Sequence, residues 1–124
     1  MKDPTNPVCR TISTLLSRIG DKWTVLVVQT LGDGSKRFNE LRREIPSVSQ
    51  RMLTLTLRNL ERDGLVNRTV TPSIPPRVDY ELTALGKSLQ KPICALATWA
   101  TENVEAIHSA LARFDAAQDE RAVA

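Results

Sequence analysis

An amphipathic stretch in the middle of the chain, residues 47–63, limits the possible folds more than any other part of the sequence. Leu53, Leu57 and Leu60 recur at intervals of four and three residues, so a helix would place all three on one face. Ser47 has the capping-box pattern with a glutamine three positions later, and a glycine directly follows the stretch. The stretch is therefore predicted to be one helix that packs its leucine face against a core.

The opposite face of this predicted helix is basic. The residues that fall on it are Arg51, Leu55, Arg58 and Arg62, with Val48, Met52 and Asn59 beside them. A helix face that is merely solvated would more often alternate basic and acidic residues one turn apart. Here the acids, Glu61 and Asp63, lie in the last turn, where the helix dipole disfavours them. The pattern indicates a DNA recognition helix that meets the polyanion along its N-terminal two-thirds.

Charge is unevenly distributed along the chain. The net charge of the 124 residues is +3, yet residues 36–77 hold nine Lys and Arg against four Asp and Glu. A basic middle favours nucleic acid over a membrane surface as the partner. At this length a single domain, residues 1–124, is expected, with poorly ordered ends at residues 1–6 and after Asp115.

Several classes of protein are disfavoured by what the sequence lacks. No apolar run approaches the ~18 residues of a membrane span and no signal-peptide core is present, so we expect a cytoplasmic protein with no membrane partner. Its two cysteines are then expected to be reduced. One histidine and two cysteines cannot complete a four-ligand zinc site, and no phosphate-binding glycine loop or catalytic cluster stands out. We expect no metal, no cofactor and no enzymatic activity.

Three shorter helices are predicted before the basic one. Asn6, followed by a proline, begins the first helix, and its apolar face ends before Gly20. Asp21 caps the second, residues 22–31, which is expected to be almost wholly buried. The third covers residues 38–45 and turns its arginines outward, and a proline ends it directly before the basic helix. Two helices joined this tightly, the second of them basic, indicate a helix-turn-helix.

After Gly64 the hydrophobic period changes from 3.6 to 2. Residues 65–70 and 77–82 are predicted strands, joined by a proline-rich tip. A hairpin directly after a recognition helix is a wing, and Arg68 and Arg77 beside its tip are predicted to contact phosphates. The alternative is a hairpin that only covers the core. The predicted fold class is mainly α with a small β-hairpin wing, a winged helix-turn-helix.

The last predicted helix begins after Thr83 and is long. Its apolar stripe consists of Leu85, Leu89, Ile93, Leu96, Ala100, Val104, Ile107, Leu111 and Phe114. The stripe spans roughly 45 Å, more than so small a core can cover, and Pro92 should kink or split the helix. We therefore predict a two-fold homodimer, with dimerisation elements at residues 7–19 and 83–114 around a DNA-binding core at residues 21–82.

An ordered set of short strings suggests a family. The strings are Cys9, Ile19-Gly-Asp-Lys-Trp23, Arg37-Phe-Asn-Glu-Leu-Arg-Arg43, Ser49-Gln-Arg-Met-Leu53, Leu60-Glu-Arg-Asp-Gly-Leu-Val66 and Pro75-Pro-Arg-Val-Asp-Tyr-Glu-Leu-Thr83. Together they resemble the HxlR-type winged-helix transcription regulators over roughly residues 8–100. The resemblance implies a homodimer, joined through its first and last helices, that represses or activates genes from a near-palindromic operator in double-stranded DNA. Several members sense oxidants or electrophiles through a cysteine near the N-terminus, where Cys9 lies.

The predicted DNA contacts are Arg37, Ser49, Gln50, Arg51, Leu55, Arg58, Arg68 and Arg77. Arg51, in the first turn of the recognition helix, could bridge guanine O6 and N7, or could contact a phosphate instead. Ser49 and Gln50 could hold a phosphate at the helix N-terminus, or could serve only as caps. Leu55 could meet a thymine methyl group or could be an isolated surface leucine. Arg58 and the arginines of the third helix would clamp phosphates.

Cys9 is the candidate redox-sensing residue. It falls near the positive end of the first helix and beside Arg10, and both features favour the reactive thiolate. The alternative is a small buried hydrophobe at the dimer interface. Cys94 is predicted to pack beside the apolar stripe. If the first and last helices meet across the dimer, Cys9 could form a disulfide with Cys94 of the partner subunit.

Two other functions compete with this interpretation. A winged-helix module that binds protein partners would not need Arg51, Arg58 and Arg62 on one exposed face. A regulator gated by a small-molecule inducer would need a pocket between the wing domain and the C-terminal helix, and no residue cluster marks one.

Overall fold

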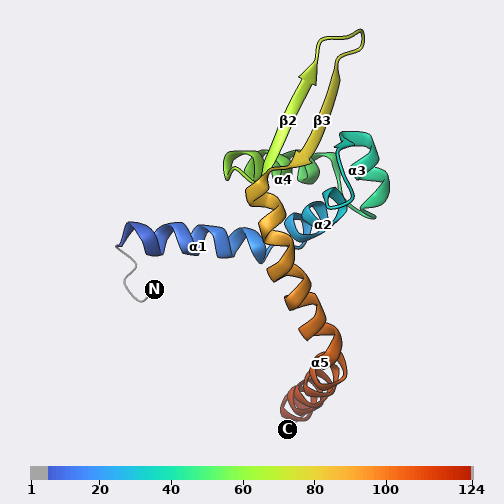
Figure 1. Cartoon of the computed structure of the whole chain (residues 1–124). Helices are drawn as coiled ribbons and strands as arrows, with labels where there is room; N and C mark the ends of the chain where they lie inside the picture. The colour runs from blue at the N-terminus through green and yellow to red at the C-terminus, as the bar shows by residue number, and fades with distance from the viewer. Residues whose placement is uncertain (1–5, 124) are drawn as a thin grey trace. The chain divides into compact units, whose positions relative to one another are not determined.

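The computed structural model describes residues 6–123, and Figure 1 shows how the chain folds. Its elements are α1 (Pro7–Ile19), α2 (Lys22–Leu31), β1 (Lys36–Arg37), α3 (Phe38–Glu44), α4 (Gln50–Arg62), β2 (Val66–Thr71), β3 (Arg77–Leu82) and α5 (Ala84–Val123). The chain divides into two compact units, a core unit up to Gln90 and a C-terminal unit from Lys91. The predicted disorder at residues 1–5 falls outside the described residues.

Two side-chain caps set the starts of the first helices where the sequence predicted them. The Asn6 Oδ1 atom accepts a hydrogen bond of 2.8 Å from the backbone N–H of Val8. The Asp21 Oδ1 atom accepts one of 2.8 Å from the N–H of Trp23. Each bond satisfies a donor that has no partner inside its helix. The prediction that α2 is almost wholly buried was wrong in part, because Trp23 is only half-buried and Leu26 is exposed.

The recognition helix α4 begins three residues later than predicted. Ser47 has a φ of 69°, which lies outside any helix, so the capping box proposed for it does not form. Ser49 is the cap instead, and its Oγ atom accepts a hydrogen bond of 3.0 Å from the N–H of Met52. The turn at Ser47 directs Val48 into the core, where it is buried rather than beside the basic face as expected. Ser47 and Ser49 could each cap this helix, but only one of them can do so at a time. Burial of Val48 favours the cap at Ser49.

The end of α4 is closed by Gly64, whose φ is +77°. This left-handed conformation suits glycine, which has no Cβ to clash with the backbone. It brings the N–H of Leu65 to the carbonyl oxygen of Leu60, at 2.9 Å. That bond satisfies one of the last carbonyl groups of the helix, as in a Schellman motif.

The core of the first unit lies between α2, α3, α4 and the base of the sheet. Its largest fully buried side chains are Val27, Val28, Leu41, Ile45, Leu53, Leu57, Leu60 and Val66. The three leucines of α4 that define its apolar periodicity are all in this set. The predicted inward face of α4 is therefore confirmed.

The wing contains a strand that the sequence did not predict. The sheet has three antiparallel strands in the order β1-β3-β2, where the sequence indicated a two-stranded hairpin. Lys36 of β1 lies opposite Tyr80, and Arg37 lies opposite Asp79. A strand of two residues is too short to show an alternating pattern, so pairing with β3 alone defines it. The outer strand β2 starts one residue later than predicted, and α3 ends one residue earlier.

The start of α5 is held against the end of α4. The Thr83 Oγ1 atom accepts a hydrogen bond of 3.0 Å from the N–H of Gly86, and its hydroxyl donates one of 2.6 Å to the carbonyl of Gly64. A Cβ atom on Gly86 would overlap the carbonyl of Leu65. Only glycine allows this close approach of helix and strand.

In the C-terminal unit, α5 continues as a helix past two predicted break points. It runs without interruption through Pro92, so of the two predicted effects of this proline, a kink or a split, the split does not occur. It also extends to Val123, although the chain after Asp115 was expected to fray. The exposed large apolar residues of this unit are Leu96, Trp99, Val104, Ile107, Leu111 and Phe114. In the described part of the chain, no helix has both the length and the apolar character needed to cross a membrane.

Candidate nucleic-acid interface

The outward face of α4 brings four of the predicted DNA contacts together. A shallow hollow of about 600 Å³ runs along this face, lined by Gln50, Arg51, Thr54, Leu55 and Arg58. All five side chains are exposed, and Leu55 keeps 49% of its surface accessible. The same helix buries its leucines on the other side. The predicted outward orientation of Arg51, Leu55 and Arg58 is therefore confirmed, while the sequence analysis did not assign Gln50 or Thr54 to this face.

Ser49 has a structural role at the start of this row. Its Oγ atom caps α4 through the hydrogen bond from Met52, as the capping alternative predicted. The hydroxyl hydrogen is still free to donate, because the cap uses only an oxygen lone pair. Ser49 can thus serve as a cap and also offer a donor to a phosphate at the helix N-terminus.

A second hollow, of about 340 Å³, lies between α4 and the wing. Its lining consists of Thr54, Leu57, Arg58, Glu61, Arg68 and Tyr80. Arg58 borders both this hollow and the one along α4, so the two adjoin. Arg68 reaches it from β2, where it lies directly opposite Tyr80 of β3. We name this second hollow the helix–wing cleft. The sequence did not single out Tyr80, because its place in the cleft depends on strand register.

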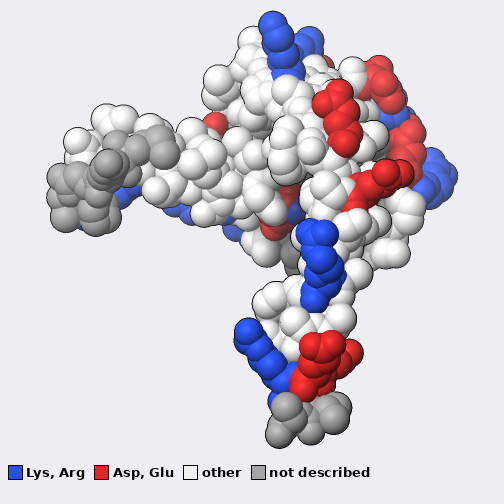
Figure 2. Space-filling view, turned by 90° about the horizontal axis from the view of Figure 1, so that it is seen from below, with Lys and Arg blue, Asp and Glu red and all other residues white. Residues whose placement is uncertain are grey.

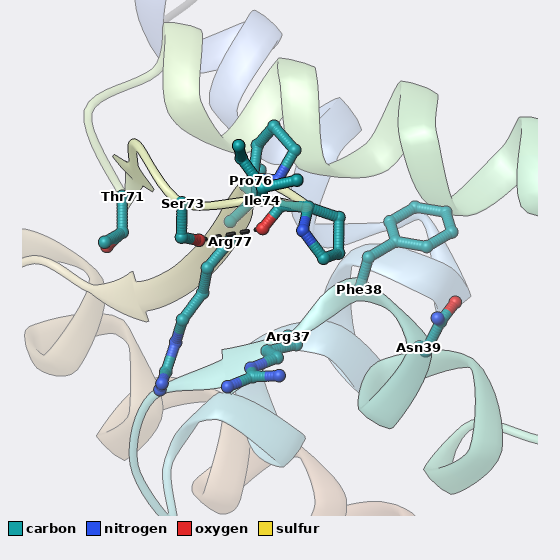
Figure 3. A pocket seen from close by; sticks show the side chains of 10 residues that line it. Arg37, Phe38, Asn39, Thr71, Ser73, Ile74, Pro76 and Arg77 are labelled. Carbon is teal, nitrogen blue, oxygen red and sulfur yellow. Dashed lines mark hydrogen bonds between the residues drawn. The ribbon is translucent and has the colours of Figure 1, made fainter.

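The other two predicted contacts, Arg37 and Arg77, line a separate hollow of about 780 Å³ beside the wing tip. Figure 3 shows both side chains extending away from the prolines of the tip, with Phe38 on the opposite side. Arg77 is paired within its own strand, its Nε atom 2.9 Å from Asp79 Oδ2. Successive residues of a strand point to opposite faces. Arg68 and Arg77, predicted as one flanking pair, therefore lie on opposite faces of the wing.

The acid at the end of α4 has a specific partner. The Arg18 Nε atom of α1 lies 2.9 Å from Asp63 Oδ2, and the two side chains are 26% and 13% exposed. The pair offsets the unfavourable position of a carboxylate at the C-terminal end of a helix dipole. It also ties α1 to the end of the recognition helix. The sequence placed Asp63 near the helix end but gave no signal for a partner 45 residues away.

The two cysteines are both free thiols and differ in exposure. Cys9 of α1 is 8% exposed, while Cys94 of α5 is exposed. Cys9 thus meets the description of a small buried hydrophobe as well as that of a residue near a helix N-terminus. Cys94 is exposed on the helix that carries the apolar stripe, and its predicted packing beside that stripe stays a prediction.

The face of the molecule seen from below differs from the outward face of α4, because it carries both signs of charge. Seen from below, the molecule shows Asp and Glu side chains beside Lys and Arg, and neither sign forms a continuous surface (Figure 2). The three arginines of the recognition helix, in contrast, are all exposed on α4. An excess of basic side chains on one helix, here three arginines against the exposed Glu61, is typical of an element that meets a polyanion.

These elements form a helix-turn-helix, α3 and α4, followed by a wing. The family model of the HxlR-like helix-turn-helix matches residues 18–108. The chain belongs to this family. The match spans the helix-turn-helix, the wing and the first part of α5, and it confirms the predicted HxlR-type winged helix-turn-helix.

Relatives in the HxlR-like family are transcriptional regulators rather than enzymes. An HTH-type transcriptional regulator of Methanothermobacter thermautotrophicus is 51% identical over 88 residues, which cover 71% of this chain and 67% of that protein. The solved structure of the redox regulator HypR in its reduced form is 42% identical, with a TM-score of 0.73, and covers 80% of this chain and 98% of HypR. The reduced form of the transcriptional regulator YodB from B. subtilis is 36% identical, with a TM-score of 0.67 and coverages of 81% and 92%.

Proposed function

We propose that this HxlR-like protein binds a specific sequence in double-stranded DNA and regulates transcription, as a repressor, with α4 in the major groove. The observation that carries the proposal is the exposed row of Gln50, Arg51, Leu55 and Arg58 on a helix whose other face is buried. Such a helix presents a bidentate guanidinium, an amide and a methyl-contacting group to base edges. Arg51 lies in the first turn, where recognition helices reach bases.

We propose that the regulator acts as a homodimer. The support is the exposed apolar stripe of the C-terminal unit, which includes Leu96, Leu111 and Phe114. Large side chains arranged in this way gain stability when a second copy covers them. A two-fold dimer would present two recognition helices to half-sites about one turn of DNA apart, so the operator is proposed to be near-palindromic. We propose that the protein is cytoplasmic, since it must reach that DNA.

A thiol response through Cys9 is the second part of the proposal. HypR is described as a redox regulator, and YodB was solved both reduced and after diamide treatment. Cys9 lies in the first turn of α1. Its side chain is buried, so the proposed reaction requires that the thiol become accessible. A disulfide between Cys9 and Cys94 of the partner subunit is one product that such a reaction could give.

The experiment is a titration of the reduced protein onto DNA from upstream of its own gene, at physiological salt with excess competitor DNA. The expected result is binding at least about 1,000-fold tighter than to competitor. Binding no tighter than to competitor DNA, for this and for operator candidates selected from a random library, would contradict sequence-specific recognition. It would favour the alternative of a module that binds protein partners.

The same titration after diamide treatment tests the thiol response. Oxidation is expected to weaken or alter specific binding of the wild-type protein and to leave Cys9→Ser unchanged. If the product is the disulfide between Cys9 and Cys94 of the partner subunit, Cys94→Ser should not respond either. Non-reducing electrophoresis shows whether the product is a disulfide-linked dimer. If diamide leaves wild-type binding unchanged, the thiol response is wrong, and a small-ligand inducer becomes the alternative to examine.

A further inference from the structure

We propose that the helix–wing cleft seats one DNA backbone phosphate, which Arg58 and Arg68 share and whose binding Glu61 weakens. This inference rests on the proposed DNA-binding function and deepens it. It assigns two arginines from different elements to a single phosphate, and it gives the one acidic side chain of the cleft a defined role.

The geometry of the cleft follows from two periodicities. Thr54, Arg58 and Glu61 are spaced by four and three residues, so they lie along one side of α4. All three line the cleft, together with Arg68 and Tyr80 from the facing strands. The cleft therefore has a guanidinium group on its helix wall and another on its wing wall. A volume of about 340 Å³ leaves room for a phosphate group and its water.

The charges of the cleft match a single phosphodiester. Neither arginine, nor Glu61, forms an ion pair with any residue that the structure describes. Two guanidinium groups and one carboxylate leave one net positive charge, and a phosphodiester carries one negative charge. Arg77, on the other face of the wing, differs because Asp79 already pairs with it.

The shape of DNA places a backbone strand at this position. The major and minor grooves are separated by one sugar–phosphate strand. A protein that inserts a helix into the major groove and lays its wing along the neighbouring minor groove must pass that strand between helix and wing. In this chain the space between those two elements is the helix–wing cleft. Arg37 and Arg77 lie beside a different hollow and would not contact the same phosphate.

The first test uses the salt dependence of affinity for a duplex of about 30 base pairs, with Arg58→Gln, Arg68→Gln and the double variant. Each phosphate neutralised by the protein contributes about 0.9 to the slope of log affinity against log salt. If the two arginines share one phosphate, the double variant lowers the slope by about one, not two. Its loss of affinity is then clearly smaller than the product of the two single losses. Arg58→Gln combined with Arg37→Gln is the control pair. Its loss of affinity should equal the product of the two single losses.

The second test is Glu61→Gln, which removes the carboxylate and keeps the size of the side chain. Without the like charge beside the phosphate, affinity should rise about 3- to 10-fold on specific and random duplexes alike. Glu105→Gln, an exposed acid in the C-terminal unit, is the control and should have no such effect. The melting temperature of each variant verifies that it is folded.

The outcomes separate this inference from the proposed function. Suppose that wild-type protein binds the duplex, that each arginine variant lowers the salt slope by about one, and that their losses of affinity multiply in the double variant. The arginines then hold separate phosphates, and the inference is wrong. It is equally wrong if Glu61→Gln leaves affinity unchanged. If wild-type protein shows no salt-dependent binding to any duplex, the DNA-binding proposal itself falls, and this inference with it.

Discussion

The recognition helix α4 and the part of α5 beyond Gln90 both carry apolar stripes at helical spacing, yet the two stripes have different surroundings. In α4, Leu57 is 2% exposed and its neighbours along the stripe are buried with it. In α5, Leu111 is 55% exposed and Phe114 is 61% exposed. Burial of one such side chain contributes about 1.5–3 kcal/mol. The α4 stripe gains this energy within the chain, whereas the α5 residues are exposed and would gain it from the second copy that we propose.

The comparison shows that a periodic pattern identifies which face of a helix is apolar but not what covers that face. α4 is flanked by α2 and the sheet, which the chain itself supplies. In the sequence, the apolar periodicity of α5 is as clear as that of α4. Its length, measured against the size of the core, was the property that indicated an outside partner.

The largest expected effect is on the covered stripe. Leu57→Ala should lower the free energy of unfolding by about 2–5 kcal/mol, because it leaves a cavity in a closely packed core. Leu55→Ala, in the same helix but half exposed, should change it by less than about 0.5 kcal/mol. Urea unfolding of the two variants at one protein concentration measures both values. Equal effects would contradict the assigned orientation of α4.

A smaller effect, and one confined to assembly, is expected on the exposed stripe. Leu111→Glu should weaken the proposed homodimer by about 2 kcal/mol, or roughly 30-fold in its dissociation constant, because it places a charge in an apolar interface. Sedimentation velocity over a range of concentrations measures this constant. Ser109→Glu, on the opposite side of α5, is the control. A wild-type protein that stays monomeric at every concentration would show that no second copy covers this stripe.

The smallest effect concerns the tie between α1 and α4. Arg18→Ala should cost at most about 1 kcal/mol of unfolding free energy, because the pair with Asp63 is partly exposed. Lys36→Ala should cost less, since its partner Glu44 keeps 46% of its side-chain surface exposed. Thermal melts compare the two. The charge exchange Arg18→Asp with Asp63→Arg should restore part of the loss, and no recovery would mean that the pair does not act as a pair.

Several elements could be predicted because local chemistry controls them. Asn6 and Asp21 fixed the starts of α1 and α2, since a cap and its first turn lie within a few residues. The leucine spacing fixed the inward face of α4, and with it the exposed row that carries Arg51 and Arg58. Gly64 fixed the end of that helix, because only the local backbone conformation matters there.

Other features depend on pairing between distant residues and became visible only in the folded chain. Ser47 and Ser49 both have a capping side chain, and burial of Val48 selected the second. β1 exists only because β3 lies beside it. The same strand register put Arg68 in the helix–wing cleft and Arg77 on the other face of the wing. Local sequence cannot encode these choices, because the free energy that settles them comes from contacts between residues far apart in the chain.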